Sequence, residues 1–163
     1  EGEITGLFLQ ETIPAGLSPV ETARRIKDQG GLVSVPHPFD RFRGHVISDA
    51  ALDQILPHID IVEAFNGRNV FSRANRQALA LAHDRGLLAT AVSDAHHSRE
   101  IGATYTELPE FDGTPQGFKE ALAHAKLVGH PSNPLVHLIS TYAKLLTRVR
   151  GRAQRWQDGA GER

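Results

Sequence analysis

Short apolar segments alternate with longer amphipathic segments along the chain, and this alternation restricts the possible folds more than any other feature. Apolar segments of strand length cover residues 3–9, 31–35, 59–65, 87–92 and 126–129, with a further candidate at 103–108. Segments with helical periodicity separate most of them, after Ser18, at 48–56, at 70–85 and after Thr114. Such an order predicts βαβ units and therefore an α/β fold whose parallel sheet is buried on both faces.

Composition excludes several classes of protein. The 163 residues contain no cysteine, so the chain has no disulfide, thiolate metal site or cysteine nucleophile. A net charge of −1 gives no general attraction to nucleic acid or to a membrane surface. No apolar run reaches the roughly 18 residues of a transmembrane helix and no signal peptide opens the chain, so we expect a cytoplasmic protein without a membrane partner.

The two ends of the chain suggest its organisation. Methionine is absent even from the first position, so we expect a processed chain or a fragment. Residues 1–130 are expected to form the α/β unit. Residues 131–150 have one apolar face and are expected to form a helix packed on that unit, with a membrane-surface or partner-binding helix as the alternative. Residues 151–163 are expected to be a polar, basic, frayed tail.

Candidate functional residues follow three successive strands, at the ends where parallel α/β proteins carry their active sites. They are His37, Glu63, Asn66, Asp94, His96 and His97. Imidazole and carboxylate groups that converge on one rim suit Mn²⁺, Fe²⁺ or Zn²⁺ better than Ca²⁺ or Mg²⁺. The pattern therefore predicts a metal site with mixed nitrogen and oxygen ligands.

Each of these residues also has a purely structural interpretation. Asp94 alone could cap a turn, but its spacing from His96 and the equivalent place of His37 on another strand favour metal binding. Glu63 lies in an apolar strand, where an unpaired carboxylate is costly. Support of a ligand histidine or pairing with an arginine is therefore favoured over direct ligation. Asn66 either forms the turn with the following glycine or contacts substrate.

Nearby basic residues are candidates for substrate binding. Arg41 and Arg43 lie in the loop after the first candidate histidine, and Arg68 follows the Asn-Gly turn. Any of them could clamp a phosphate, although surface arginines are common. His97 is a candidate for protonating a leaving group, with an ordinary loop histidine as the alternative.

Three motifs carry a resemblance to a known family. The segments VPHPFD, DIVEAFNGR and AVSDAHHSREIG resemble the second half of a PHP (polymerase and histidinol phosphatase) domain, over roughly residues 1–130. The resemblance implies the C-terminal part of a distorted (β/α)7 TIM-like barrel with parallel strands. It also implies two or three metal ions at the rim and hydrolysis of phosphoesters. His37 matches the histidine of the third family motif, and Asp94 and His96 match the fourth.

The remaining ligand motifs of the family have no match here. The first 30 residues contain no histidine, and the surroundings of Glu1, Glu3 and Glu11 do not resemble the metal-binding glutamate motif. A complete barrel also needs on the order of 200–250 residues. We therefore expect the C-terminal portion of a PHP protein, with an open sheet edge that favours self-association.

These observations predict hydrolysis of a small phosphorylated substrate by metal-activated water. The alternative is a non-catalytic PHP-like module with a structural or partner-binding role. Nucleic acid is not favoured as a substrate, because basic residues predominate only in the tail.

Overall fold

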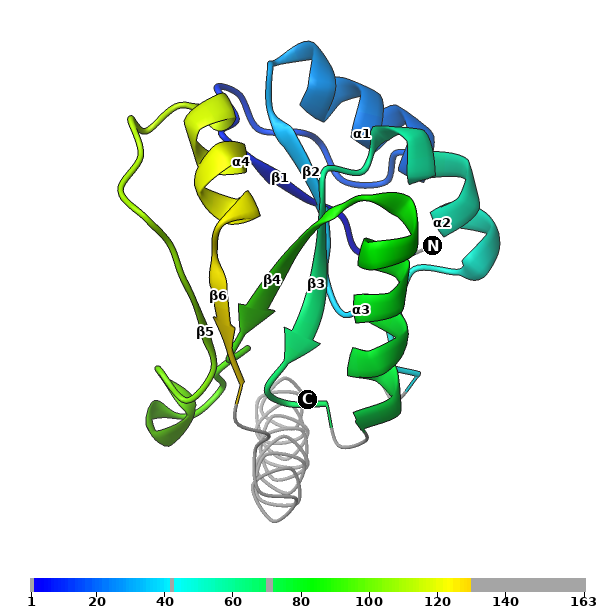
Figure 1. Cartoon of the computed structure of the whole chain (residues 1–163). Helices are drawn as coiled ribbons and strands as arrows, with labels where there is room; N and C mark the ends of the chain where they lie inside the picture. The colour runs from blue at the N-terminus through cyan, green and yellow to red at the C-terminus, as the bar shows by residue number, and fades with distance from the viewer. Residues whose placement is uncertain (1, 42, 70–71, 130–163) are drawn as a thin grey trace, which may run out of the picture. The chain divides into compact units, whose positions relative to one another are not determined.

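The computed structural model describes residues 2–41, 43–69 and 72–129, so the expected C-terminal helix and tail lie outside the described residues (Figure 1). The strands are β1 (Thr5–Leu7), β2 (Leu32–Val35), β3 (Ile61–Asn66), β4 (Leu88–Val92), β5 (Tyr105–Glu107) and β6 (Lys126–Val128). The helices are α1 (Pro19–Asp28), α2 (Asp49–Ile55), α3 (Ser72–Arg85) and α4 (Pro115–Ala123), with 3₁₀ turns η1 (Leu56–His58) and η2 (Ser98–Glu100). None of the helices described has the length and hydropathy required to cross a bilayer.

Four strands form one mostly parallel sheet in the order β1-β2-β3-β4, which confirms the α/β class. The pairs β2–β3 and β3–β4 are parallel. β5 and β6 form a separate antiparallel pair. The described strands do not close into a barrel, so the structure supports an α/β fold but not the TIM-like barrel itself.

The expectation of an entirely parallel sheet was wrong for β5 and β6, which pair antiparallel with each other, and for β1, which runs antiparallel to β2. For β1 the reason lies in its connection to β2. The backbone N–H groups of Gln10 and Glu11 donate to the side chain of Gln29, so the chain leaves β1 near the end of α1. Residues 8–18 then lead back to the start of α1. A segment of this length spans on the order of 35 Å, enough to run along the sheet without a helix.

Alternate residues of the central strands face two different apolar clusters. Val33 and Val62 pack in the larger cluster with α1, α2 and α3, whereas Leu32 and Ile61 pack with Leu122 of α4. This alternation follows from the two-residue period of a strand. Helices therefore cover both faces of β2 and β3, and polar side chains at the strand ends are left to form a site.

Three helices begin at a residue whose side chain accepts a backbone hydrogen bond. Ser18 accepts from the N–H of Glu21, Ser48 from that of Ala51, and Thr114 from that of Gly117. Such N-caps satisfy amide groups that have no partner within the helix. The caps thus fix where α1, α2 and α4 begin.

Asp60 ties the amino end of β3 to three other elements. Its carboxylate accepts from Lys27 Nζ at 2.7 Å, Lys119 Nζ at 3.2 Å and the Val33 N–H at 2.9 Å. Burial alone would raise the pKa of Asp60, but these hydrogen bonds outweigh it and lower the pKa below 3.8. The ionised carboxylate therefore joins α1, β2 and α4.

We predict that Asp60→Asn lowers the free energy of unfolding by about 1–3 kcal/mol, because charge-assisted hydrogen bonds to two helices are weakened. Urea unfolding at neutral pH measures the loss. Asp60 stabilises the fold above its unfolded pKa of 3.8, and this contribution is lost as the pH falls through the lower folded pKa. The exposed Asp53→Asn is the matched control, and equal stability of the two variants would contradict the prediction.

Candidate functional site

The carboxyl ends of β2, β3 and β4 lie at one edge of the sheet, because the three strands are parallel neighbours. His37 follows β2, Glu63 and Asn66 lie near the end of β3, and Asp94 follows β4. A register shift between Glu63 and Phe65 interrupts the pairing of β3 with β4. Such bulges redirect side chains and are frequent beside functional sites.

Two of the predicted ligands have an unusual backbone conformation. His37 has φ 30° and Asp94 has φ 51°, both in the positive region that residues with a side chain rarely adopt. Phe8 is the third such residue in the described part of the chain, apart from glycines. Costly conformations of this kind cluster at functional sites. The backbone therefore singles out the same two positions as the sequence motifs.

Asp94 lies at the centre of a hydrogen-bonded polar cluster. Arg43 donates to Asp94 Oδ2 and, at 2.9 Å, to Asp40 Oδ2, while Asn66 Nδ2 donates to Asp94 at 3.1 Å. Burial would raise the pKa of Asp94, but the hydrogen bonds from Arg43 and Asn66 outweigh it and lower the pKa. Asp94 is therefore a carboxylate at neutral pH.

His37 is only 6% exposed, and its Nε2 atom lies 3.2 Å from Glu3 Oε2. Burial, aided by the positive charge of Arg43, lowers the pKa of His37. The imidazole is thus neutral at neutral pH, which is the form that binds metal ions. Glu3 is a residue that the sequence motifs did not identify.

The signal that could have identified Glu3 is strand register. Thr5 pairs with Ser34 in the antiparallel pair, so the residues before Thr5 run alongside those that follow Ser34. This places Glu3 near His37. The signal depends on knowing that β1 is antiparallel, which the alternation of apolar segments did not reveal.

His96 and His97 are both exposed on the loop after β4. His96 Nδ1 lies 2.8 Å from the backbone oxygen of Asp94 and 3.7 Å from its Oδ1. The first contact orients the ring and leaves Nε2 as the nitrogen for any further ligand. His97 is the N-cap residue that precedes the 3₁₀ turn η2.

Glu100 holds this loop in place, and no motif had identified it. Its Oε2 accepts from the backbone N–H groups of His96 at 2.8 Å and His97 at 3.0 Å. The guanidinium of Arg68 lies 3.5 Å from the same oxygen. Arg68, a candidate phosphate clamp, is only 7% exposed and faces Glu100. The sequence signal for the support of this loop by Glu100 is an acidic residue four positions after His96.

Glu63 is buried beneath the cluster. Its Oε1 accepts from Asn66 Nδ2 at 2.5 Å, and the backbone N–H of His37 also donates to it. Burial raises the pKa of Glu63 to about 7, although the hydrogen bond from Asn66 opposes the shift. Asn66 is 1% exposed, and its oxygen accepts from the Arg68 N–H, so its amide links parts of the site.

The chemical types of these side chains fit a divalent metal, since His37 and His96 offer imidazoles and Glu3 and Asp94 offer carboxylates. Their positions do not yet converge. Within the described ranges, no three His, Asp or Glu side chains are placed to share an ion. Arg43 instead pairs with Asp94. The donors are therefore present as two pairs, Glu3 with His37 and Asp94 with His96.

These features define an α/β protein with a polar site at the carboxyl edge of its parallel strands. Residues 72–127 match the family model PHP_C, described as PHP-associated. The resemblance found in the sequence to the C-terminal portion of a PHP protein is thus confirmed over these residues.

Two proteins of Methanocaldococcus jannaschii are similar in sequence. Uncharacterized protein MJ0417 is 35% identical over 114 residues, which are 68% of this chain and 48% of that protein. Uncharacterized protein MJ1587 is 48% identical over 80 residues, which are 48% of this chain and 44% of that protein. The chain spans about half the length of these relatives.

Two crystal structures are similar in fold. PsfC from Pseudomonas syringae has a TM-score of 0.62 at 18% identity, over 90% of this chain and 62% of that chain. A two-domain Bacteroides vulgatus protein, described as containing a predicted PHP-like metal-dependent phosphoesterase, has a TM-score of 0.57 at 18% identity. That match covers 78% of this chain and 40% of the other. At this identity the likeness is one of fold.

We predict that Glu63→Gln removes a pH dependence of stability. The folded carboxyl has a pKa of about 7 against 4.5 when unfolded, so its contribution is full below pH 4.5 and lost as the pH rises through 7. Raising the pH from 5 to 8 should lower the free energy of unfolding of the wild type by about 2–3 kcal/mol relative to that of Glu63→Gln. Urea unfolding in the presence of a chelator measures both values. Glu11→Gln is the control and should show the pH dependence of the wild type. If the free energies of unfolding of wild type and Glu63→Gln differ by the same amount at every pH, the raised pKa of Glu63 is contradicted.

We also predict that Glu100→Gln loosens the loop after β4, because a neutral amide accepts the N–H groups of His96 and His97 less strongly. Hydrogen exchange of these two amides should accelerate about tenfold, as expected for losing part of a charge-assisted hydrogen bond. The exposed Glu110→Gln should leave their exchange unchanged. Unaltered exchange in Glu100→Gln would show that other contacts hold the loop.

Proposed function

We propose that this chain provides part of the active site of a metal-dependent phosphoesterase. The observation that carries the proposal is the positive φ of His37 and Asp94, at the two strand ends where the family motifs place metal ligands. The match of residues 72–127 to PHP_C and the description of the Bacteroides vulgatus protein support it. The proposed substrate is a small phosphorylated molecule.

In this proposal a divalent metal is held by four side chains, those of His37, Asp94, His96 and Glu3. Mn, Fe and Zn all suit these donors, and two or three ions are proposed for an intact site. The metal supplies an activated water and positive charge beside the phosphoryl group. The match covers only about half of the length of each relative, so we propose that ligands from outside these 163 residues complete the site.

The remaining residues act around this centre. Glu100 keeps the His96 loop in position through its two backbone hydrogen bonds. Asn66 donates to Asp94 and so orients its carboxylate. We propose that Arg43, which is partly exposed beside Asp94, stabilises charge on a phosphoryl oxygen. His97 is the proposed proton donor to the leaving group.

A non-catalytic module remains the second candidate, and one observation favours it. Arg43 neutralises Asp94 directly, so this carboxylate has a counter-ion without any metal. If Arg43 and Asp94 stay paired, Asp94 is not available to a metal, and the domain would have a structural or partner-binding role.

The test is the metal content of the 163-residue protein, purified without chelator or affinity histidines and measured by mass spectrometry. We predict bound Mn, Fe or Zn in wild type and at least about a tenfold loss in Asp94→Asn, because a ligand charge is removed. The exposed Asp49→Asn is the matched control.

Three outcomes are decisive. Metal that depends on Asp94 supports the proposal, and phosphoesterase assays of the longer protein should then show the same dependence. Full metal content in Asp94→Asn contradicts the assigned site. A wild-type chain that binds no metal requires the same measurement on the longer protein, in which continued absence of metal favours the non-catalytic module.

A further inference from the structure

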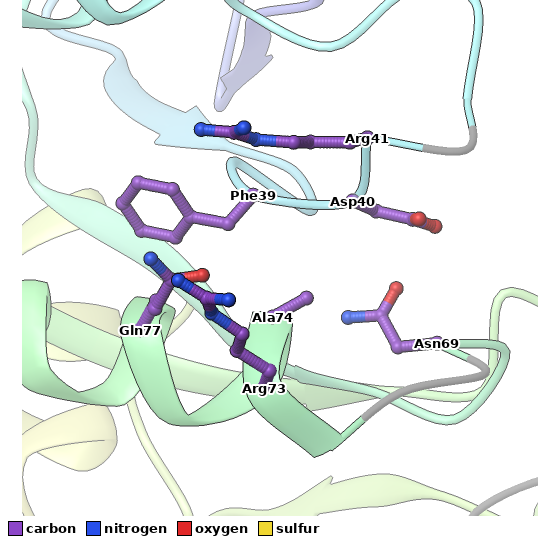
Figure 2. A pocket seen from close by; sticks show the side chains of 7 residues that line it. All are labelled: Phe39, Asp40, Arg41, Asn69, Arg73, Ala74 and Gln77. Carbon is purple, nitrogen blue, oxygen red and sulfur yellow. The ribbon is translucent and has the colours of Figure 1, made fainter.

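A separate cavity of about 250 Å³ opens beside the polar cluster. Figure 2 shows it between two walls, with the loop after β2 on one side and the beginning of α3 on the other. Phe39, Asp40 and Arg41 come from the loop, whereas Arg73 and Gln77 come from α3. Asn69 lies between these walls at the end of the cavity near Asp40.

The cavity contains two cations without counter-ions. Arg41 and Arg73 are both exposed, and they extend from opposite walls. Within residues 2–41, 43–69 and 72–129 neither guanidinium takes part in an ion pair or a side-chain hydrogen bond. The carboxylate of Asp40 accepts from Arg43 Nε, and in Figure 2 it points away from the Arg41 guanidinium. Two arginines that share a cavity and lack acidic partners attract an anion.

The other side chains suit a ligand that is partly polar and partly apolar. The amide of Gln77 can donate hydrogen bonds, the amide nitrogen of Asn69 already donates to Asn75, and the ring of Phe39 forms an apolar wall. The volume is just below the roughly 300–1,000 Å³ of pockets that enclose a whole small ligand. The cavity therefore fits a fragment of a ligand, such as one phosphate group and the atoms attached to it.

Asp40 connects this cavity to the candidate active site. Its carboxylate lines the cavity and accepts from Arg43 Nε at 2.9 Å, while the same guanidinium donates to Asp94. Figure 2 shows the Asp40 carboxylate and Asn69 at one end of the cavity and the guanidiniums of Arg41 and Arg73 toward the other, so a ligand that extends along the cavity from these arginines would reach Asp40.

We propose that the cavity binds a second phosphate group of the substrate, distinct from the one that is hydrolysed. The assignment to substrate rests on the proposed function, whereas binding of phosphate to Arg41 and Arg73 does not. The proposal narrows the substrate class from phosphoesters in general to molecules with two phosphate groups.

The first experiment measures binding of inorganic phosphate by calorimetry, on the 163-residue protein at low salt with chelator present. We expect saturable binding that weakens at least about fivefold in Arg41→Gln and in Arg73→Gln, because each removes a charged donor to phosphate. Arg85→Gln, at the other end of α3, loses the same charge and should bind as wild type does. Thermal unfolding verifies that the variants are folded.

Absence of saturable binding, or undiminished binding in both Arg41→Gln and Arg73→Gln, overturns the proposal. Because the chelator removes metal, this result does not depend on whether the chain is a phosphoesterase. A failure of the metal test with phosphate binding intact therefore affects the proposed function alone.

The second experiment distinguishes a substrate phosphate from a free phosphate that binds at the same place. In the longer, metal-loaded protein, Arg73→Gln should lower kcat/KM about tenfold for a sugar bisphosphate, which has a second phosphate group. The same variant should leave kcat/KM unchanged for p-nitrophenyl phosphate, which has only one. Equal losses for both substrates, or no loss for either, would contradict the assignment to substrate.

Discussion

The parallel pairing of β2, β3 and β4 is the constraint on which the site depends, and Asn66 is the residue that connects its parts. This buried amide donates to Glu63 and Asp94 and accepts from the Arg68 N–H. Its backbone N–H donates to Asn75 of α3. One side chain thus links β3 to the loop after β4, and its backbone is fixed to a helix. An amide suits this position because it donates and accepts at once without adding charge.

Much of the fold could be predicted from local sequence, because strand length, helical periodicity and capping residues act over short distances. The central strands and the start of α1 at Pro19 follow from such signals. The direction of β1 could not be predicted in this way, since residues 8–18 lack a signal for where they lead. The placement of His37 and Asp94 at the same edge of the sheet was predictable because strand ends in a parallel sheet meet at one edge. Glu3 was not, because its place beside His37 depends on the tertiary pairing of β1 with β2, whereas the bonds of Glu100 to His96 and His97 are local and had a sequence signal.

Glu63 and Asp94 show how one cluster holds two carboxyl groups in different states. Both are bound by the Asn66 amide, yet the pKa of Glu63 is raised and that of Asp94 is lowered. The difference arises because Glu63 is more deeply buried, while Asp94 also has the Arg43 guanidinium. Groups whose environments separate their pKa values can take different roles in one site. Here the outer carboxylate keeps its charge, and the inner one is half protonated near pH 7.

Because β1 pairs antiparallel with β2, the register of this pair determines where Glu3 lies. Only three residue pairs, Thr5 with Ser34, Gly6 with Val33 and Leu7 with Leu32, hold β1 against β2. Side chains alternate between the two faces of a strand, so a slip by one residue would turn Glu3 away from His37. Changes of length within residues 8–18 leave this alignment intact, because they fall after the paired residues. One added residue between Glu3 and Thr5 would not. A single insertion before β1 can therefore remove the Glu3 carboxylate from the site during evolution, while His37, His96 and Asp94 keep their positions.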